Sequence, residues 1–229
     1  MPHTPSGKPV MVSAKRIFDA VRLGDTVGLS GLLKQGADLE TRNEANNTSL
    51  HYAIVKGSAK AALLLIEAGA PIDAQGEVRR TPLMLALALD MNPVAEALLE
   101  KGADTSLKDK FNATALSIVK ASGNAKGMQL MFARLGEKEL YEEALWAIGE
   151  DDVESLKFLV EKMGVKLSSP GPGGIVLADD IALWGDGEVA DYVAKATSSE
   201  TARQAASKLR PGLQAPKQAR FSKKNGSAP

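Results

Sequence analysis

Residues 48–53 read Thr-Ser-Leu-His-Tyr-Ala, and residues 81–86, which begin 33 positions later, read Thr-Pro-Leu-Met-Leu-Ala. The same spacing relates three sets of landmarks: Thr48, Thr81 and Thr114; Leu50, Leu83 and Leu116; Gly36, Gly69 and Gly102. A fixed period of this length is typical of stacked repeats, in which each unit buries its apolar face only against its neighbours. The period therefore predicts a repeat architecture for the first two thirds of the chain.

Each period carries the signals of two short helices. Thr48 is a suitable N-cap for a helix over residues 49–56, because its hydroxyl can accept a bond from an N–H of the first turn. A second helix is expected at about residues 59–68, and Gly69 can end it in the left-handed conformation that glycine adopts without strain. Later units repeat these signals, with a closing glycine expected at Gly136 in the fourth.

These residues resemble the ankyrin repeat. The pattern of that family is Thr-Pro-Leu-His-x-Ala, later Leu-Leu, and then Gly-Ala-Asp, which stands here at residues 36–38 and 102–104. The resemblance covers residues 14–134. It implies an all-α repeat solenoid of ankyrin-type helix-turn-helix units joined by β-hairpin loops, the fingers of the repeat.

The landmarks weaken beyond Leu135, where helical patterns continue without a capping Thr or a Gly-Ala-Asp. We expect a flexible N-terminus over residues 1–12 and a solenoid over residues 13–197. Its regular units end at about residue 136, and degenerate units or a helical cap occupy about residues 137–197. A basic disordered tail is expected over residues 198–229, which cannot bury enough apolar surface to order themselves.

Charge is unevenly distributed although the formal net charge is zero. Residues 198–229 hold seven Lys and Arg and one acid, a net charge of +6, which leaves residues 1–197 at −6. Such a tail can act as a solubilising segment, a recognition or export address, or a site for nucleic acid or an acidic partner. The acidic body disfavours a large nucleic-acid footprint.

No segment of the sequence indicates a membrane or a secreted protein. No apolar run approaches the roughly 20 residues that span a bilayer, and no secretory signal is recognisable near the N-terminus. The absence of cysteine excludes disulfides, Cys-ligated zinc and thiol catalysis. We expect a cytoplasmic protein with no membrane partner, with export by a non-classical route as the alternative.

Candidates for chemistry all have simpler interpretations. His51 falls in the fixed pattern of the first helix, where the resemblance implies a structural role. Adjacent acids at residues 151–152 and 179–180 point in different directions and cannot form an acid–base pair across a cleft. The glycines of residues 171–174 lack the Lys of a phosphate-binding loop. We predict that the protein has no catalytic residue, no metal site and no cofactor. We therefore expect that it is not an enzyme.

The resemblance also implies where binding takes place, because ankyrin repeats commonly use the finger tips and the groove-facing end of the first helix. The matching positions of this sequence are Arg42, Glu44, Lys56, Gln75, Glu77, Val78, Arg80, Leu89, Lys108, Lys110 and Phe111. Ala45, Val78 and Phe111 share one register position. Exposed apolar groups rimmed by charge suggest a contact site, although single exposed apolar residues are also ordinary.

The leading hypothesis is a scaffold that binds a protein partner through its concave face and fingers and is a monomer when unbound. Association of nucleic acid or an acidic partner with the basic tail is one alternative. A bacterial effector, or an inhibitor or immunity-type binding protein, is another, because both bind proteins in the same way. An enzyme site after Leu135 has the least support, since the sequence offers no nucleophile–base pair there.

Overall fold

The computed structural model describes residues 14–168, 170–171, 176–179 and 187–197 of the 229. The expected N-terminal segment 1–12, the basic tail 198–229 and the helical pattern around residues 181–184 lie outside these residues. The chain divides into two compact units, residues 1–134 and residues 135–229. We call them unit 1 and unit 2, and their boundary falls where the sequence period ends.

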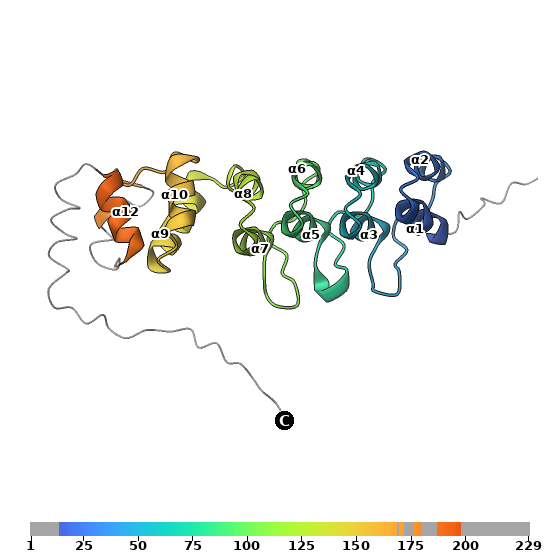
Figure 1. The fold of residues 1–229 in the computed structure, drawn as a ribbon, viewed down its shortest axis with the longest axis horizontal. Helices are drawn as coiled ribbons and strands as arrows, with labels where there is room; N and C mark the ends of the chain where they lie inside the picture. Colours follow the sequence, from blue (N-terminus) through green and yellow to red (C-terminus); the bar gives the residue numbers. More distant parts are fainter. Residues whose placement is uncertain (1–13, 169, 172–175, 180–186, 198–229) are drawn as a thin grey trace, which may run out of the picture. The chain divides into compact units, whose positions relative to one another are not determined.

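Unit 1 consists of four helix pairs arranged in two rows (Figure 1). We call the helices of one row the inner helices: α1 (Ala14–Leu23), α3 (Ser49–Val55), α5 (Pro82–Ala88) and α7 (Ala115–Ser122). The outer helices are α2 (Thr26–Lys34), α4 (Ala59–Glu67), α6 (Asn92–Glu100) and α8 (Ala125–Phe132). Each helix packs against its partner and against the next helix of its own row. This stacking is the repeat solenoid that the sequence predicts.

The predicted caps of these helices are confirmed. Thr48, Thr81 and Thr114 each accept a hydrogen bond from the backbone N–H three residues later, at the start of α3, α5 and α7. Gly69 and Gly102 follow the outer helices α4 and α6 with φ of 84°. A side chain would be strained at this φ, so glycine ends the helix at least cost.

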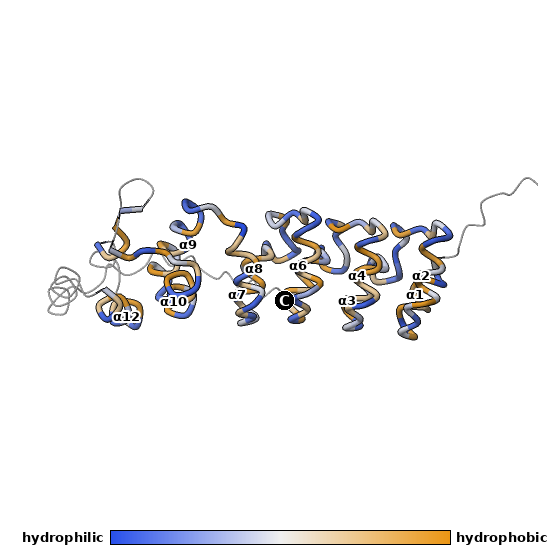
Figure 2. The backbone as a smooth tube through the Cα atoms, turned by 90° about the horizontal axis from the view of Figure 1, so that it is seen from above, coloured by the Kyte–Doolittle hydropathy of each residue, from blue (hydrophilic) through white to orange (hydrophobic). Residues whose placement is uncertain are grey.

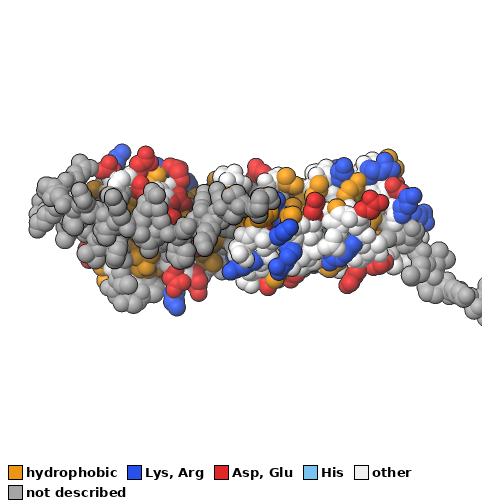
Figure 3. All heavy atoms as spheres, turned by 90° about the horizontal axis from the view of Figure 1, so that it is seen from below, with side chains coloured by type: hydrophobic (Ala, Val, Ile, Leu, Met, Phe, Trp, Pro, Cys, Tyr) orange, Lys and Arg blue, Asp and Glu red, His pale blue; other side chains and the backbone are white. Residues whose placement is uncertain are grey.

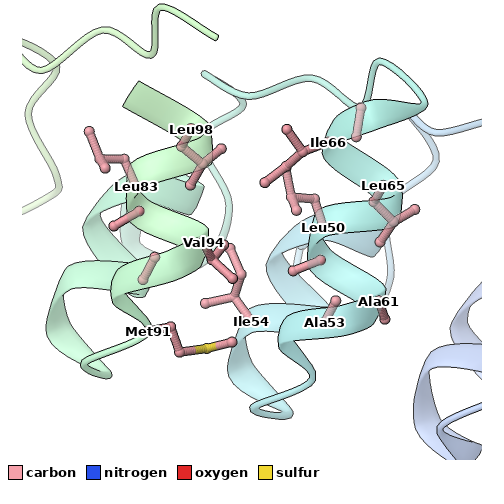
Figure 4. Packing of buried hydrophobic residues seen from close by; sticks show 14 of the residues in the cluster. Leu50, Ala53, Ile54, Ala61, Leu65, Ile66, Leu83, Met91, Val94 and Leu98 are labelled. Atoms are coloured by element: carbon pink, nitrogen blue, oxygen red, sulfur yellow. The ribbon is translucent and has the colours of Figure 1, made fainter. Parts of the chain in front are cut away.

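The core of unit 1 lies between successive helix pairs. Leu50, Ile54, Leu83, Val94 and Leu98 are all 0% exposed. Figure 4 shows side chains of the α3–α4 pair pointing into the space that they share with the α5–α6 pair. Hydrophobic stretches recur along each helix pair in Figure 2. Since each helix pair buries its apolar residues against the next pair, no helix pair has a complete core of its own.

The predicted end of the fourth repeat at Gly136 is wrong. Helix α8 ends at Phe132, and Gly136 has φ of −73° and is the N-cap of the next helix, α9 (Glu137–Gly149). This helix lies in the region beyond Leu135 where the sequence predicts further helical patterns. The acidic Glu137 and Glu139 lie in its first turn, where negative charge favours the helix N-terminus.

Unit 2 contains α9, α10 (Val153–Glu161) and α12 (Glu188–Ala196), with α10 packed against both of the others. Asp152 caps α10 by accepting a bond from the Ser155 N–H at 3.0 Å, and Asp151 accepts one from the Val189 N–H at 3.0 Å. These acids therefore hold backbone in place. Within the described residues, no helix has the length and apolar character needed to cross a membrane.

Candidate partner-binding surface

Three fingers connect the helix pairs of unit 1 and descend from the row of inner helices (Figure 1). We define finger 1 as residues 40–48, finger 2 as residues 73–81 and finger 3 as residues 106–114. Each is closed by the same backbone bond, spanning four residues: Asn43 N–H to Asn47 O, Gly76 N–H to Arg80 O, and Asp109 N–H to Ala113 O, at 2.9 to 3.0 Å. The repeat therefore specifies the finger turns as well as the helices.

Side-chain oxygens hold the tips of fingers 1 and 3. Asn43 Oδ1 accepts bonds from the N–H groups of Ala45 and Asn47 at 3.1 and 2.9 Å. Asp109 Oδ1 accepts the equivalent bonds, from Phe111 at 2.8 Å and Ala113 at 2.9 Å. Backbone N–H groups that donate to the side chain of a preceding Asn or Asp in this way stabilise turns. They fix the tip residues Ala45 and Phe111.

Finger 2 has a different turn because Gly76 stands where the other fingers have Asn43 or Asp109. A Cβ atom on Gly76 would overlap Asn47 Oδ1 and the ring of His51. Its absence lets Asn47 Oδ1 accept a bond from the Glu77 N–H at 3.0 Å. The tip then forms a short 3-10 turn, η1 (Glu77–Arg79), in which Val78 has φ of 49°. This conformation is strained for a β-branched residue.

Hydrogen bonds between neighbouring fingers hold all three in one arrangement. The Arg42 guanidinium donates to the Gln75 carbonyl at 2.8 Å, and the Gln75 amide donates to the Lys108 carbonyl at 3.0 Å. The Lys110 N–H donates to the Val78 carbonyl at 2.8 Å, which supports the strained turn. Arg42 and Gln75 were predicted as partner contacts, and their side chains also connect the fingers.

An ion pair links fingers 2 and 3. Arg80 Nε lies 3.5 Å from Asp109 Oδ2, with the side chains 36% and 1% exposed. Removing the cation would leave a buried carboxylate without its partner, which is costly. Arg80 was predicted as a partner contact, and this pair gives it a role in folding as well. A substitution at Arg80 therefore changes the finger and any binding surface together.

His51 connects the start of α3 to finger 2 from a fully buried position. The Thr48 N–H donates to His51 Nδ1 at 3.3 Å, which leaves the hydrogen on Nε2, and Nε2 donates to the Arg80 carbonyl at 3.0 Å. Burial lowers the pKa of His51 below 6.5, and the nearby charge of Arg42 lowers it further. Backbone carbonyls of Arg80 and Ala74 act in the opposite direction. His51 is thus a structural residue, as predicted.

The repeats of unit 1 belong to a known family. Residues 17–109 match the family described as ankyrin repeats, in three copies. Unit 1 therefore contains ankyrin repeats. No curated protein matches it. Ankyrin repeats are generally protein–protein interaction modules and typically non-enzymatic. The fourth helix pair, α7 and α8, lies beyond the matched residues but keeps the Thr114 cap and the finger turn of the other repeats.

The ankyrin repeats are expected to lose stability as the pH falls below about 6.5, because His51 takes up a proton more readily in the unfolded chain than in its buried site. Each unit by which folding lowers the pKa is worth about 1.4 kcal/mol. Urea unfolding of the full chain at pH values between 5 and 7.5 measures the effect, in a range above most carboxylate titrations.

The matched control for this prediction is His51→Met, since Met84 occupies the same position of the next ankyrin repeat and is equally buried. The variant should be less stable at neutral pH but should lose the dependence on pH in this window. An equally steep dependence in the variant would assign the effect to another group.

Most of the predicted contact residues are exposed on the finger side of the ankyrin repeats. The exposed set is Arg42, Glu44, Lys56, Glu77, Val78, Leu89, Lys108, Lys110 and Phe111, whereas Gln75 and Arg80 are half-buried. Phe111 is 69% exposed and Leu89 50%. In the view from the finger side, Lys and Arg side chains gather below α5 and α7 (Figure 3). Whether these residues contact a partner remains a prediction.

Apolar residues on the inner helices extend this surface. Val55 is a groove position that the resemblance already implies, whereas the predicted contact set omits Tyr52 and Leu85. Val55 is 51% exposed at the end of α3, and Lys56 Nζ lies 5.4 Å from the centre of the half-buried Tyr52 ring. Leu85 occupies the position of Tyr52 in the next repeat and is also half-buried. The recurrence of large apolar residues at one register position was a signal that could have identified them.

Two hollows are formed by the described residues. One of about 420 Å³ in unit 2 has Glu137, Tyr141 and Lys166 among its lining residues. One of about 400 Å³ lies on α1 and α2 and includes Arg16 and Asp19. Within the part of the chain that the structure describes, no three His, Asp or Glu side chains are grouped as metal ligands.

Proposed function

We propose that this ankyrin-repeat protein binds a protein partner through the tips of its fingers and the adjoining ends of its inner helices. The observation that carries the proposal is the exposure of Phe111, Val78 and Leu89 on a surface whose backbone is held by bonds between fingers. Exposed apolar side chains bordered by charge are typical of contact sites. A partner that covers these side chains would bury apolar surface area that folding leaves exposed to water.

The arrangement of the fingers favours binding because the finger loops are already ordered before a partner binds. Immobilising a loop on binding costs conformational entropy, and a loop that is already fixed loses less. Fingers 1 and 2 share the Arg42–Gln75 bond, and fingers 2 and 3 share the Gln75–Lys108 and Lys110–Val78 bonds. The surface is therefore preorganised across all three fingers, without any contribution from a ligand.

Capture of a partner from a lysate of the source cells tests the proposal. The full chain, immobilised, should retain a specific protein that mass spectrometry identifies. Replacing Phe111 and Lys110 with Ala should weaken capture about tenfold or more, since exposed aromatic anchors dominate many interfaces. Arg80 is left intact because its pairing with Asp109 also stabilises the fold.

A control that removes two cations elsewhere, one more than the Phe111 and Lys110 variant, separates this effect from general changes of charge. Lys60 and Lys101 are exposed on the outer helix α4 and just after α6, away from the fingers. Replacing both with Ala should leave capture unchanged, and both double variants should unfold at the urea concentration of the parent. Undiminished capture by the Phe111 and Lys110 variant would remove the finger tips from the binding site.

A further inference from the structure

The exposed charge on the three fingers changes sign along the stack. At the tip of finger 1, Glu44 is exposed, and the Arg42 guanidinium donates to the carbonyls of Asn46 and Gln75 at 2.8 Å. The tips of fingers 2 and 3 carry four cations, Arg79, Arg80, Lys108 and Lys110. Fingers 2 and 3 therefore form the cationic end of the binding surface.

Three acids offset the four cations in part and leave a net charge of +1 on fingers 2 and 3. Asp73 and Glu77 are exposed in finger 2 and balance Arg79 and Arg80 there, so the excess positive charge lies on finger 3. Asp109 is buried, with its carboxylate turned toward backbone N–H groups and Arg80. Because Asp109 is enclosed within the finger, an incoming ligand meets Lys108 and Lys110 on the surface rather than this acid. A negatively charged ligand is favoured there.

Apolar groups lie among these cations. Phe111 is 69% exposed at the tip of finger 3, and Val78 is 37% exposed at the tip of finger 2. The bond from the Lys110 N–H to the Val78 carbonyl joins these two tips. Neither residue belongs to the core cluster of unit 1. The two side chains are suited to hold one large apolar side chain of a ligand between flanking positive charges.

The small excess of positive charge on the fingers favours a short ligand over a long polyanion. A nucleic acid carries a phosphate charge at every nucleotide, whereas fingers 2 and 3 hold only four cations together with three acids. A short acidic segment of a protein can confine its charge to Lys108 and Lys110.

We propose that fingers 2 and 3 bind an acidic protein segment that carries a large apolar side chain. Carboxylates of the segment pair with Lys108 and Lys110, and its apolar side chain packs against Phe111 and Val78. This inference rests on the proposed function and names the chemistry of the partner. The strained turn at Val78 places finger 2 against finger 3 before the ligand arrives, as expected of a preorganised site.

Fluorescence anisotropy with a labelled synthetic peptide, Glu-Asp-Glu-Leu-Phe-Glu-Asp-Glu, tests the inference on the full chain. The peptide should bind saturably and more tightly at low salt than at physiological salt. Replacing its Leu-Phe by Ser-Ser, or its acids by Lys, should weaken binding about tenfold or more. Phe111→Ser and the pair Lys108→Glu with Lys110→Glu should produce losses of similar size. The pair Lys60→Glu with Lys101→Glu should stay within about twofold of the parent.

Each contrary result identifies which idea fails. Absence of saturable peptide binding overturns the inference, as does an equal loss in the Lys60 and Lys101 control. Stronger binding of a single-stranded oligonucleotide than of the peptide, with the same dependence on Lys108 and Lys110, assigns the cationic tips to nucleic acid instead. If a lysate partner is captured through Phe111 but excess peptide does not compete with it, the proposed function stands and the acidic partner is rejected.

Discussion

Replacing Leu83 with Ala is expected to lower the free energy of unfolding of the ankyrin repeats by about 2–5 kcal/mol. Leu83 is 0% exposed in α5, which packs against both α3 and α7. Truncation removes buried apolar area and leaves a cavity that the surrounding helices can fill only in part. Because the stacked repeats lack independent cores, the loss weakens the interfaces on both sides of the α5–α6 pair.

Urea unfolding followed by circular dichroism measures this loss, and Leu89→Ala is the matched control. Leu89 immediately follows α5 and is 50% exposed, so the same truncation there should change stability by less than about 0.5 kcal/mol. A Leu83→Ala variant that unfolds at the urea concentration of the parent would show that α5 does not pack as described.

Replacing Asp109 with Ala is expected to lower the free energy of unfolding by about 1.5–3 kcal/mol. The change removes the acceptor for the N–H groups of Phe111 and Ala113, and it also removes the partner of Arg80. Hydrogen bonds to a charged group are worth more than neutral ones, and a donor left without a partner in a partly buried site adds a further cost. Urea unfolding of the full chain measures the difference.

Asp109→Asn separates the two contributions of this carboxylate. Asn43 accepts the same two backbone bonds in finger 1, so an amide at position 109 can keep the turn of finger 3. The Asn variant should therefore lose less than about 1 kcal/mol, since Arg80 is 36% exposed and stays partly hydrated. If Asn is as damaging as Ala, the pairing with Arg80 dominates and the turn bonds are secondary.

The stacking residues were predictable because each repeat needs the same helix caps at the same positions. The caps at Thr48, Thr81 and Thr114, and the left-handed Gly69 and Gly102, depend on interactions within a few residues of the chain. The same repetition identifies the exposed column of Val78 and Phe111, because stacking leaves that register position outside the core. The signal fails at Gly136, where the local sequence starts a new helix instead of ending the previous one.

The double roles of the finger residues were not predictable from spacing. Arg42, Gln75 and Arg80 appear as free contact residues in the sequence, yet each bonds to a finger formed by residues about 30 positions away. Asp109 and Gly76 stand outside the landmarks from which the repeat was recognised, so their roles were not predicted. Their roles depend on the distance between neighbouring fingers, which only the stacked structure sets.

The sequence by itself determined the repeat, its helix ends and the side of the stack on which residues remain exposed, since these follow from local capping and from burial with a fixed period. Only the tertiary structure decided how the fingers are joined and which charges stay available. It encloses Asp109 while Lys108 and Lys110 remain in water, and it gives finger 2 a strained turn beside Gly76. The physical reason is that stacking brings atoms of neighbouring repeats within hydrogen-bond distance. The period of the sequence alone does not specify which atoms meet.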